Sequence, residues 1–162
     1  MQGVTIRPSL PADLAFITGL ERNAENRDFI GQWSDAEHLA AIARENRREH
    51  WIIEHDGLPA GYLIDYDCRE LGAGFHVKRI LIEDKNRGIG REALGQFGAH
   101  VFALEGVSCV WLNVRDWNTR AQKVYSKLGY TRFDPGPEEA ARYDASGEAP
   151  SEGAFRMRLA KR

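Results

Sequence analysis

The sequence predicts one domain built on a mixed α/β sheet. Two strand-like runs surround Asp56-Gly57, a residue pair typical of a tight hairpin turn. A strand, a long helix and a second strand follow one another between Ile80 and Val114, which is the order of a parallel crossover. The 162 residues have the length of a single domain, and no internal repeat or linker divides them.

The N-terminal part combines short apolar patterns with proline and capping signals. Residues 4–7 alternate apolar and polar side chains, which predicts a short strand that Pro8 ends. Helical spacing after Pro11 predicts a helix whose inner face is Leu14, Ile17, Leu20 and Ala24. The capping box at residues 34–37 predicts a second helix, which ends near Asn46 and buries Leu39, Ile42 and Ala43.

The rest of the chain alternates strand and helix patterns. The hairpin strands are predicted at 51–55 and 60–66, and a third strand runs from Phe75 to Ile82. A helix follows Gly90 and ends at Gly106, with an inner face of Ala93, Leu94, Phe97, Val101 and Leu104. Later elements are a strand at 108–114, a helix at 117–128 and strands at 130–133 and 154–159.

Residues 134–153 are predicted to form an acidic loop. They hold three prolines, three glycines and six acids against the single Arg142, a local charge of −5. Such a segment is typical of a solvated surface loop. It is also compatible with an acidic wall that attracts a cationic amine, to which Trp33, Phe29 and Tyr143 would add aromatic surface.

Composition excludes several classes of protein. With 22 basic and 24 acidic residues the net charge is −2, so there is no basic footprint for nucleic acid. No apolar run approaches the roughly 18 residues of a membrane span, and two cysteines make no disulfide framework. We therefore expect a cytoplasmic protein. Its histidines lack metal-ligand spacing, so no metal site is expected.

The most informative segment runs from Ile80 to Ala93. A strand leads into a glycine-bearing turn, and the turn leads into a helix whose first N–H groups have no intrahelical acceptor. Lys85, Arg87 and Arg91 surround this turn with positive charge. The pattern predicts a phosphate or pyrophosphate site, although Gly88 and Gly90 are also compatible with a tight turn alone.

A dinucleotide fingerprint is a third interpretation of the same glycines. Gly88-x-Gly90-x-x-Ala93 fits its spacing, but five residues separate Ile82 from Gly88, whereas the fingerprint follows its strand directly. No P-loop element is present.

The segment resembles the signature of the GNAT superfamily of acyl-CoA-dependent N-acetyltransferases, which reads Gln/Arg-x-x-Gly-x-Gly/Ala at a strand-to-helix turn. Here the turn is Lys85-Asn86-Arg87-Gly88-Ile89-Gly90, and the lysine keeps the charge but loses the planar donor fork. A second match is downstream, in Leu112-Asn113-Val114, Asn118, Ala121, Tyr125 and Gly129-Tyr130. Gly61-Tyr62 fits the family's hairpin.

The resemblance implies a mostly antiparallel central sheet, flanked by helices and splayed at the cofactor-binding strand. It implies that the backbone of Ile80 and Ile82, with their side chains in the core, pairs with the pantetheine arm of acetyl-CoA. The turn from Lys85 to Arg91, including Arg87, Gly88, Ile89 and Gly90, would bind the pyrophosphate. Asn118 would contact the cofactor or cap its helix, and asparagine suits both roles.

The resemblance also implies the chemistry. Acetyl would move from acetyl-CoA to a primary amine, of a small molecule or a peptide, by direct attack in a ternary complex. Tyr125 would protonate the leaving thiolate, unless it is a core aromatic. His76 is the candidate base, because an amine with a pKa near 10 must lose a proton, but it is equally compatible with a buried strand histidine. Relatives are commonly homodimers.

Overall fold

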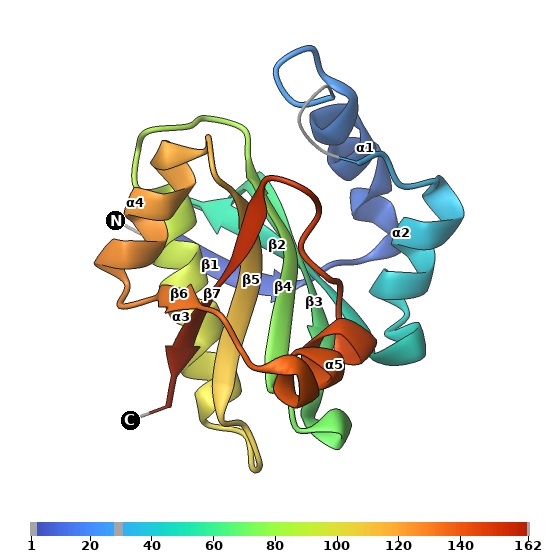
Figure 1. Cartoon of the computed structure of the whole chain (residues 1–162). Coiled ribbons are helices and arrows are strands. Elements are labelled where there is room, and N and C mark those ends of the chain that lie inside the picture. Colours follow the sequence, from blue (N-terminus) through green and yellow to red (C-terminus); the bar gives the residue numbers. More distant parts are fainter. Residues whose placement is uncertain (1–2, 28–30, 162) are drawn as a thin grey trace. The chain divides into compact units, whose positions relative to one another are not determined.

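The computed structural model describes residues 3–27 and 31–161. Its elements are β1 (Val4–Pro8), α1 (Leu14–Arg22), α2 (Asp35–Ile42), β2 (Arg48–His55), β3 (Leu58–Asp67), β4 (Phe75–Ile82), α3 (Ile89–Phe102), β5 (Cys109–Arg115), α4 (Thr119–Lys127), β6 (Thr131–Phe133), α5 (Pro137–Ser146) and β7 (Ala154–Ala160). The seven strands form one sheet in the order β1-β2-β3-β4-β5-β7-β6 (Figure 1). This mixed α/β sheet, mostly antiparallel, confirms the predicted fold class.

The chain divides into two compact units. The first unit comprises residues 1–64 and 79–93, and the second comprises residues 65–78 and 94–162. Strands β3 and β4 each contribute residues to both units. Within the two described stretches of the chain, no helix has the length and apolar character that a bilayer crossing requires.

The hairpin of the first unit forms as its turn residues predict. Asp56 and Gly57 both have positive φ, 51° and 82°, which is what a tight turn matching the strand twist demands. Strand β1 pairs antiparallel with β2, from Val4 opposite His55 to Pro8 opposite Trp51.

Helix α2 begins at the predicted capping box but differs in its end and its buried face. Ser34 Oγ accepts a hydrogen bond from the Glu37 N–H at 3.2 Å, and a Glu37 carboxylate oxygen accepts one from the Ser34 N–H at 3.1 Å. The helix ends at Ile42, because Arg44 and Asn46 have positive φ. The predicted inner face was wrong: His38 and Ala41 are buried, whereas Leu39 is 39% exposed.

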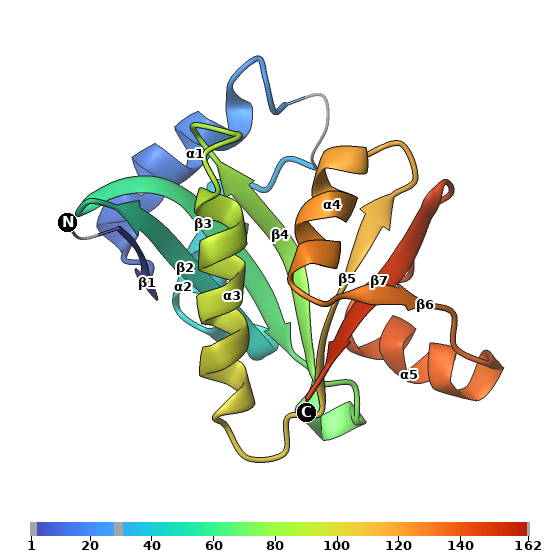
Figure 2. The same cartoon turned by 90° about the vertical axis from the view of Figure 1, so that its left-hand side faces the viewer.

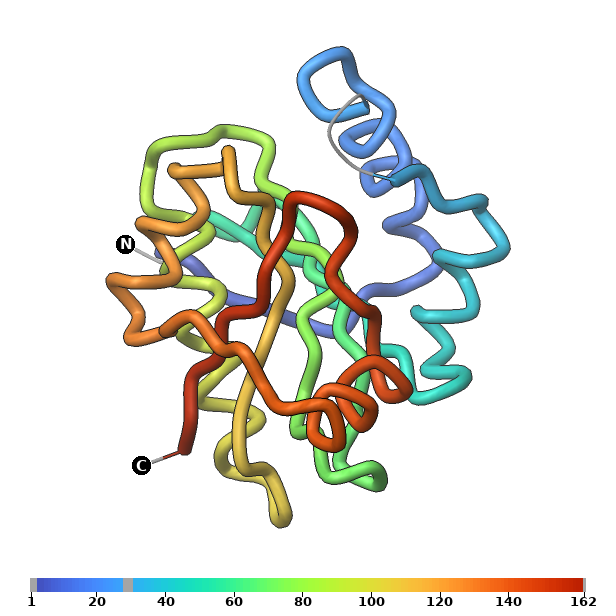
Figure 3. The backbone as a smooth tube through the Cα atoms, viewed as in Figure 1, coloured from blue at the N-terminus to red at the C-terminus, as the bar shows by residue number. Residues whose placement is uncertain are grey.

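The predicted parallel crossover is present, and the strand pairing that defines it lies in the second unit. Strand β4 pairs parallel with β5, with Phe75 opposite Val110 and His76 opposite Trp111, and the chain passes through α3 between them (Figure 3). Strand β7 pairs antiparallel with both β5 and β6 and lies between them (Figure 2). Splaying of β4 from β5 beyond the paired residues stays a prediction.

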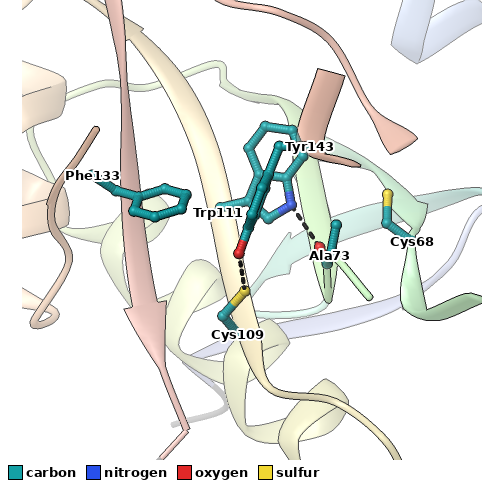
Figure 4. Packing of buried hydrophobic residues seen from close by; sticks show 6 residues of the cluster. All are labelled: Cys68, Ala73, Cys109, Trp111, Phe133 and Tyr143. Carbon is teal, nitrogen blue, oxygen red and sulfur yellow. Dashed lines mark hydrogen bonds between the residues drawn. The ribbon is translucent and has the colours of Figure 1, made fainter. Parts of the chain in front are cut away.

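The acidic segment was predicted as a loop, and that prediction was wrong over residues 137–146, which form α5. Pro137 occupies the first turn, where its missing N–H costs nothing, and Glu138 and Glu139 favour the positive end of the helix dipole. Tyr143 is 3% exposed and packs its ring edge-on against Trp111 and Phe133, at centroid distances of 5.0 and 4.9 Å (Figure 4). Its hydroxyl lies 3.6 Å from the sulfur of Cys109.

Because Tyr143 is the main apolar anchor of α5, Tyr143→Ala should release this helix. We expect a loss of about 3–5 kcal/mol in the free energy of unfolding, measured with urea, and faster amide exchange over residues 137–146. Arg142→Ala, at an exposed position of the same helix, is the control. Equal exchange rates in Tyr143→Ala and the unmodified protein would contradict the anchoring role.

Candidate functional site

The glycine-bearing turn leaves an accessible helix start in the first unit. Gly88 has a φ of +76° and its carbonyl accepts the Glu92 N–H at 3.1 Å, so the first helical hydrogen bond of α3 begins there. The preceding N–H groups therefore have no acceptor within the helix. Apart from Gly88 and its two chain neighbours, no described residue has a heavy atom within 4 Å of the place where a Gly88 Cβ would stand, so the backbone is open to a ligand.

The strand and helix around the turn are closely packed. Ile89 is 3% exposed and anchors the start of α3, and a Cβ on Gly90 would lie 3.3 Å from Ile82 Cγ1. A Cβ on Gly61 would lie 2.4 Å from the Leu81 carbonyl oxygen, so β3 requires glycine there. Leu81 is buried, whereas Ile80 and Ile82 are half-buried, so their expected place in the core was only partly correct.

Lys85 is hydrogen-bonded to Asn26, in the segment that follows helix α1. Its Nζ donates to Asn26 Oδ1 at 2.8 Å, and Asn26 Nδ2 donates to the Leu20 carbonyl at 2.9 Å. Asn26 is only 3% exposed. The ammonium at the first position of the signature therefore ties the turn to α1. Arg87, which is exposed, pairs with Asp84 at 2.9 Å.

A buried ionic network in the first unit was not predicted from the sequence. The Glu21 carboxylate is fully buried, and its Oε1 accepts hydrogen bonds from Arg79 Nη1 at 2.7 Å and from the Trp33 N–H at 2.8 Å. Its other oxygen is bonded to His38 Nε2. Burial acts to raise the Glu21 pKa, but the hydrogen bonds and the positive charge of Arg79 outweigh it, and the pKa is lowered.

The network continues through two histidines to Ser9. His38 Nδ1 lies 3.2 Å from His50 Nε2, and His50 Nδ1 lies 2.7 Å from Ser9 Oγ. Burial lowers the His50 pKa to about 3, so this ring is neutral. No sequence signal joins these side chains, because they come from separate parts of the chain. Within residues 3–27 and 31–161 no His, Cys, Asp and Glu side chains group as a metal site.

Asn118 and Tyr125 lie at the start and near the end of α4 in the second unit. The Asn118 side chain accepts the Ala121 N–H at 3.1 Å and so caps the helix, while its contact with a cofactor stays a prediction. Tyr125 is half-buried with its ring 6.0 Å from that of Tyr130. Burial raises the Tyr125 pKa to about 12, so the phenol holds its proton at neutral pH.

His76 lies in an apolar environment in the second unit. Its ring stacks on Trp111 at a centroid distance of 4.0 Å, and a Cβ on Gly147 would lie 2.8 Å from it. Burial lowers its pKa to about 3. The nearby Trp111 backbone acts to raise the His76 pKa, whereas the positive charges of Lys78 and Arg156 lower it further. Neither ring nitrogen makes a hydrogen bond of good geometry with a described residue. The role as base stays a prediction, which these surroundings do not favour.

Ion pairs neutralise most of the acidic segment. Four of its six acids pair with basic residues of the strands: Asp134 with Arg132, Glu139 with Arg158, Asp144 with Arg156, and Glu148 with Lys78. The aromatic side chains that were predicted to offer surface to an amine are also mostly engaged in contacts within the protein. Tyr143 is buried, Trp33 has the guanidinium groups of Arg48 and Arg79 over its ring, and Phe29 lies outside the described residues.

Comparison with known proteins identifies the family. A family model described as the acetyltransferase (GNAT) domain matches residues 4–131. The chain belongs to the GNAT acetyltransferase family. The match contains the glycine turn and α4, the two segments that carry the sequence resemblance. No curated protein sequence matches this chain significantly.

Solved GNAT structures share its fold. Spermidine N-acetyltransferase from Vibrio cholerae, in complex with CoA and spermine, is 18% identical with a TM-score of 0.75, covering 99% of this chain and 96% of that one. An aminoglycoside acetyltransferase in complex with coenzyme A is 16% identical with a TM-score of 0.79, covering 98% and 95%. Ribosomal-protein-S18-alanine N-acetyltransferase from Escherichia coli is 20% identical with a TM-score of 0.69, covering 97% and 93%.

The two buried neutral histidines predict a loss of stability in mild acid. Their folded pKa values near 3 lie below the ordinary 6.5, so the unfolded chain takes up protons first as the pH falls. Stability is thus lost from about pH 6.5 downward, by about 2 kcal/mol for each histidine between pH 7 and pH 5.

Urea unfolding at both pH values tests this expectation. His50→Gln and His76→Gln should each reduce the pH-dependent difference by about 2 kcal/mol, whereas His100→Gln, at an exposed position, serves as the control. The same difference in all four proteins would show that neither imidazole is held neutral.

Proposed function

We propose that the chain is an acyl-CoA-dependent N-acetyltransferase that moves acetyl from acetyl-CoA to a primary amine. The observation that carries this proposal is the open strand-to-helix turn at Gly88 in a chain of the GNAT family. Two of the solved structures that share its fold are complexes with CoA, which supports the same cosubstrate.

The residues of the turn fit a pyrophosphate. We assign it to the N–H groups of Arg87, Gly88 and Gly90, with Ile89 and Arg91 in the same helical turn, because unpaired N–H groups and the helix dipole both favour an anion. The backbone of Ile80 and Ile82 would pair with the pantetheine arm, and Asn118 is the further cofactor contact. Lys85, engaged by Asn26, would hold the turn in place.

The reaction joins the amine nitrogen to the thioester carbonyl carbon and breaks the carbon–sulfur bond. The protonated amine loses one proton to solvent before the attack and a second after the new bond forms. The leaving sulfur takes up one proton, for which we propose the Tyr125 hydroxyl as donor. Much of the rate would come from holding amine and thioester together, and from a backbone N–H, that of Ile80, at the carbonyl oxygen.

Two alternatives predict different behaviour. A catalytically silent acyl-CoA-binding module would bind acetyl-CoA without turnover of any amine. A dinucleotide-binding protein would be stabilised by NAD and not by CoA.

Isothermal titration with acetyl-CoA, and with NAD as the control ligand, should show saturable binding of acetyl-CoA only. Gly88→Leu should weaken this binding by about tenfold or more, because the side chain blocks the N–H groups and the positive φ strains it. Gly106→Leu is a matched control, since Gly106 also has a positive φ of 81° and open space around it. Equal weakening by both substitutions would contradict the assigned site.

Tyr125→Phe should lower kcat by about a hundredfold while acetyl-CoA binding changes little, because only the proton donor is lost. Steady-state kinetics and titration measure the two effects separately. Tyr130→Phe is the matched control, because it removes a phenol hydroxyl whose ring lies 6.0 Å away in the same unit. An unchanged kcat in Tyr125→Phe would remove Tyr125 from this role.

A further inference from the structure

A cluster of charged and amide side chains occupies one face of β4, β5 and β7 in the second unit. Lys78 Nζ donates to both carboxylate oxygens of Glu148, at 2.6 and 2.7 Å. Asn113 Nδ2 donates to the Glu148 carbonyl at 2.9 Å, and Arg156, opposite Asn113 in the β5–β7 ladder, pairs with Asp144. We call these five residues the Glu148 cluster.

The cluster contains polar atoms that the fold leaves without partners. Asn113 Oδ1 and Arg156 Nε are buried, and neither has a hydrogen-bond partner in the part of the chain that the structure describes. Arg156 is 8% exposed, and burial lowers its pKa. A buried polar atom without a partner costs about 1–3 kcal/mol, so two adjacent ones on paired strands indicate a place where a ligand supplies the missing bonds.

The unused atoms have complementary chemistry. Asn113 Oδ1 is an unused acceptor on the residue whose amide nitrogen bonds the Glu148 carbonyl, and the Glu148 carboxylate is a further acceptor. These two groups would receive the protons of an ammonium group. Arg156 Nε is a charged donor on the same face as the Lys78 ammonium, and these two would donate to a carboxylate. Lys78 and Glu148 are 19% and 43% exposed along their side chains, so a ligand can reach their pair from solvent.

We propose that the Glu148 cluster binds the acceptor, and that the acceptor is a zwitterionic amine of the amino-acid class. Its ammonium would replace Lys78 as the partner of Glu148, and its carboxylate would replace Glu148 as the partner of Lys78. This exchange leaves no charge unpaired. A polyamine has no carboxylate. Its ammonium would take Glu148 from Lys78 and leave the Lys78 ammonium unpaired beside a second positive charge.

This inference rests on the proposed acetyltransferase function and deepens it. Lys78 precedes Ile80 by two residues on β4, the strand that we assign to the pantetheine arm.

The test measures CoA release with each L-amino acid, with the matching amine that lacks the carboxylate, and with spermidine. The unmodified protein should have a higher kcat/KM for at least one amino acid than for its decarboxylated partner and for spermidine. Lys78→Met should lower the ratio of kcat/KM for that amino acid to kcat/KM for its decarboxylated partner by about tenfold or more, mainly through KM. Lys127→Met, at an exposed lysine of α4, is the control.

A charge reversal separates recognition from folding. In the double variant Lys78→Glu with Glu148→Lys the ion pair is kept, so unfolding by urea should resemble that of the unmodified protein. The positive and negative side chains would nevertheless have exchanged places, so a bound amino acid would face like charges. Its kcat/KM should stay at least tenfold below that of the unmodified protein. A kcat/KM in the double variant equal to that of the unmodified protein would show that the Lys78–Glu148 pair is purely structural and would overturn the proposal.

The outcomes also separate this inference from the function on which it rests. If the unmodified protein shows no saturable binding of acetyl-CoA in titration, the acetyltransferase proposal is overturned, and the acceptor class with it. Acetyl-CoA binding together with faster acetylation of spermidine or of decarboxylated amines would overturn the acceptor class alone. Acetyl-CoA binding without turnover of any amino acid would also overturn it.

Discussion

The buried carboxylate of Glu21 is the interaction on which the first unit depends. A charge removed from water is costly unless its partners are close, and here Arg79, the Trp33 N–H and His38 all contact it. Arg79 belongs to β4 and His38 to α2, so one anion on α1 links three elements. One residue earlier, the Leu20 carbonyl accepts the Asn26 amide, which in turn receives Lys85 from the glycine turn. The end of α1 therefore fixes both the strand and the turn that we assign to acetyl-CoA.

Electrostatics serves a different purpose in the second unit. The acids of the segment 134–153 are spread along α5 and its flanking connections. Four of them form ion pairs with basic residues of β4, β6 and β7. This balance removes most of the net charge that the composition implied, so the face does not attract cations by charge alone. In our proposal, recognition there depends on which individual ion pairs a ligand can enter and replace. A polycation gains little from a face whose charges already cancel, whereas a ligand with both charges can exchange with a pair.

The sequence predicted those elements whose signal lies within a few neighbouring residues. The Asp56-Gly57 turn, the capping box at Ser34 and the glycine turn at Gly88 all depend on local backbone chemistry. The His38–Glu21 bond was not predictable in this way, because it joins helices through tertiary packing and gives a polar residue the buried position expected for Leu39. Helix α5 was missed because prolines and glycines dominate its segment, and its burial depends largely on Tyr143 rather than on a repeated apolar face. The residues that we propose for the acceptor belong to no sequence motif.

The two units also differ in how completely their buried polar atoms are bonded. In the described part of the first unit, no buried side-chain nitrogen or oxygen lacks a partner, and even the neutral His50 is bonded on both ring nitrogens. In the second unit, His76, Asn113 and Arg156 leave atoms unpaired on three adjacent strands. Unsatisfied buried groups lower stability, so each of these atoms calls for a partner outside the described residues. The saturated network of the first unit therefore serves rigidity. The unpartnered atoms of the second unit are the reason why we propose the acceptor site there.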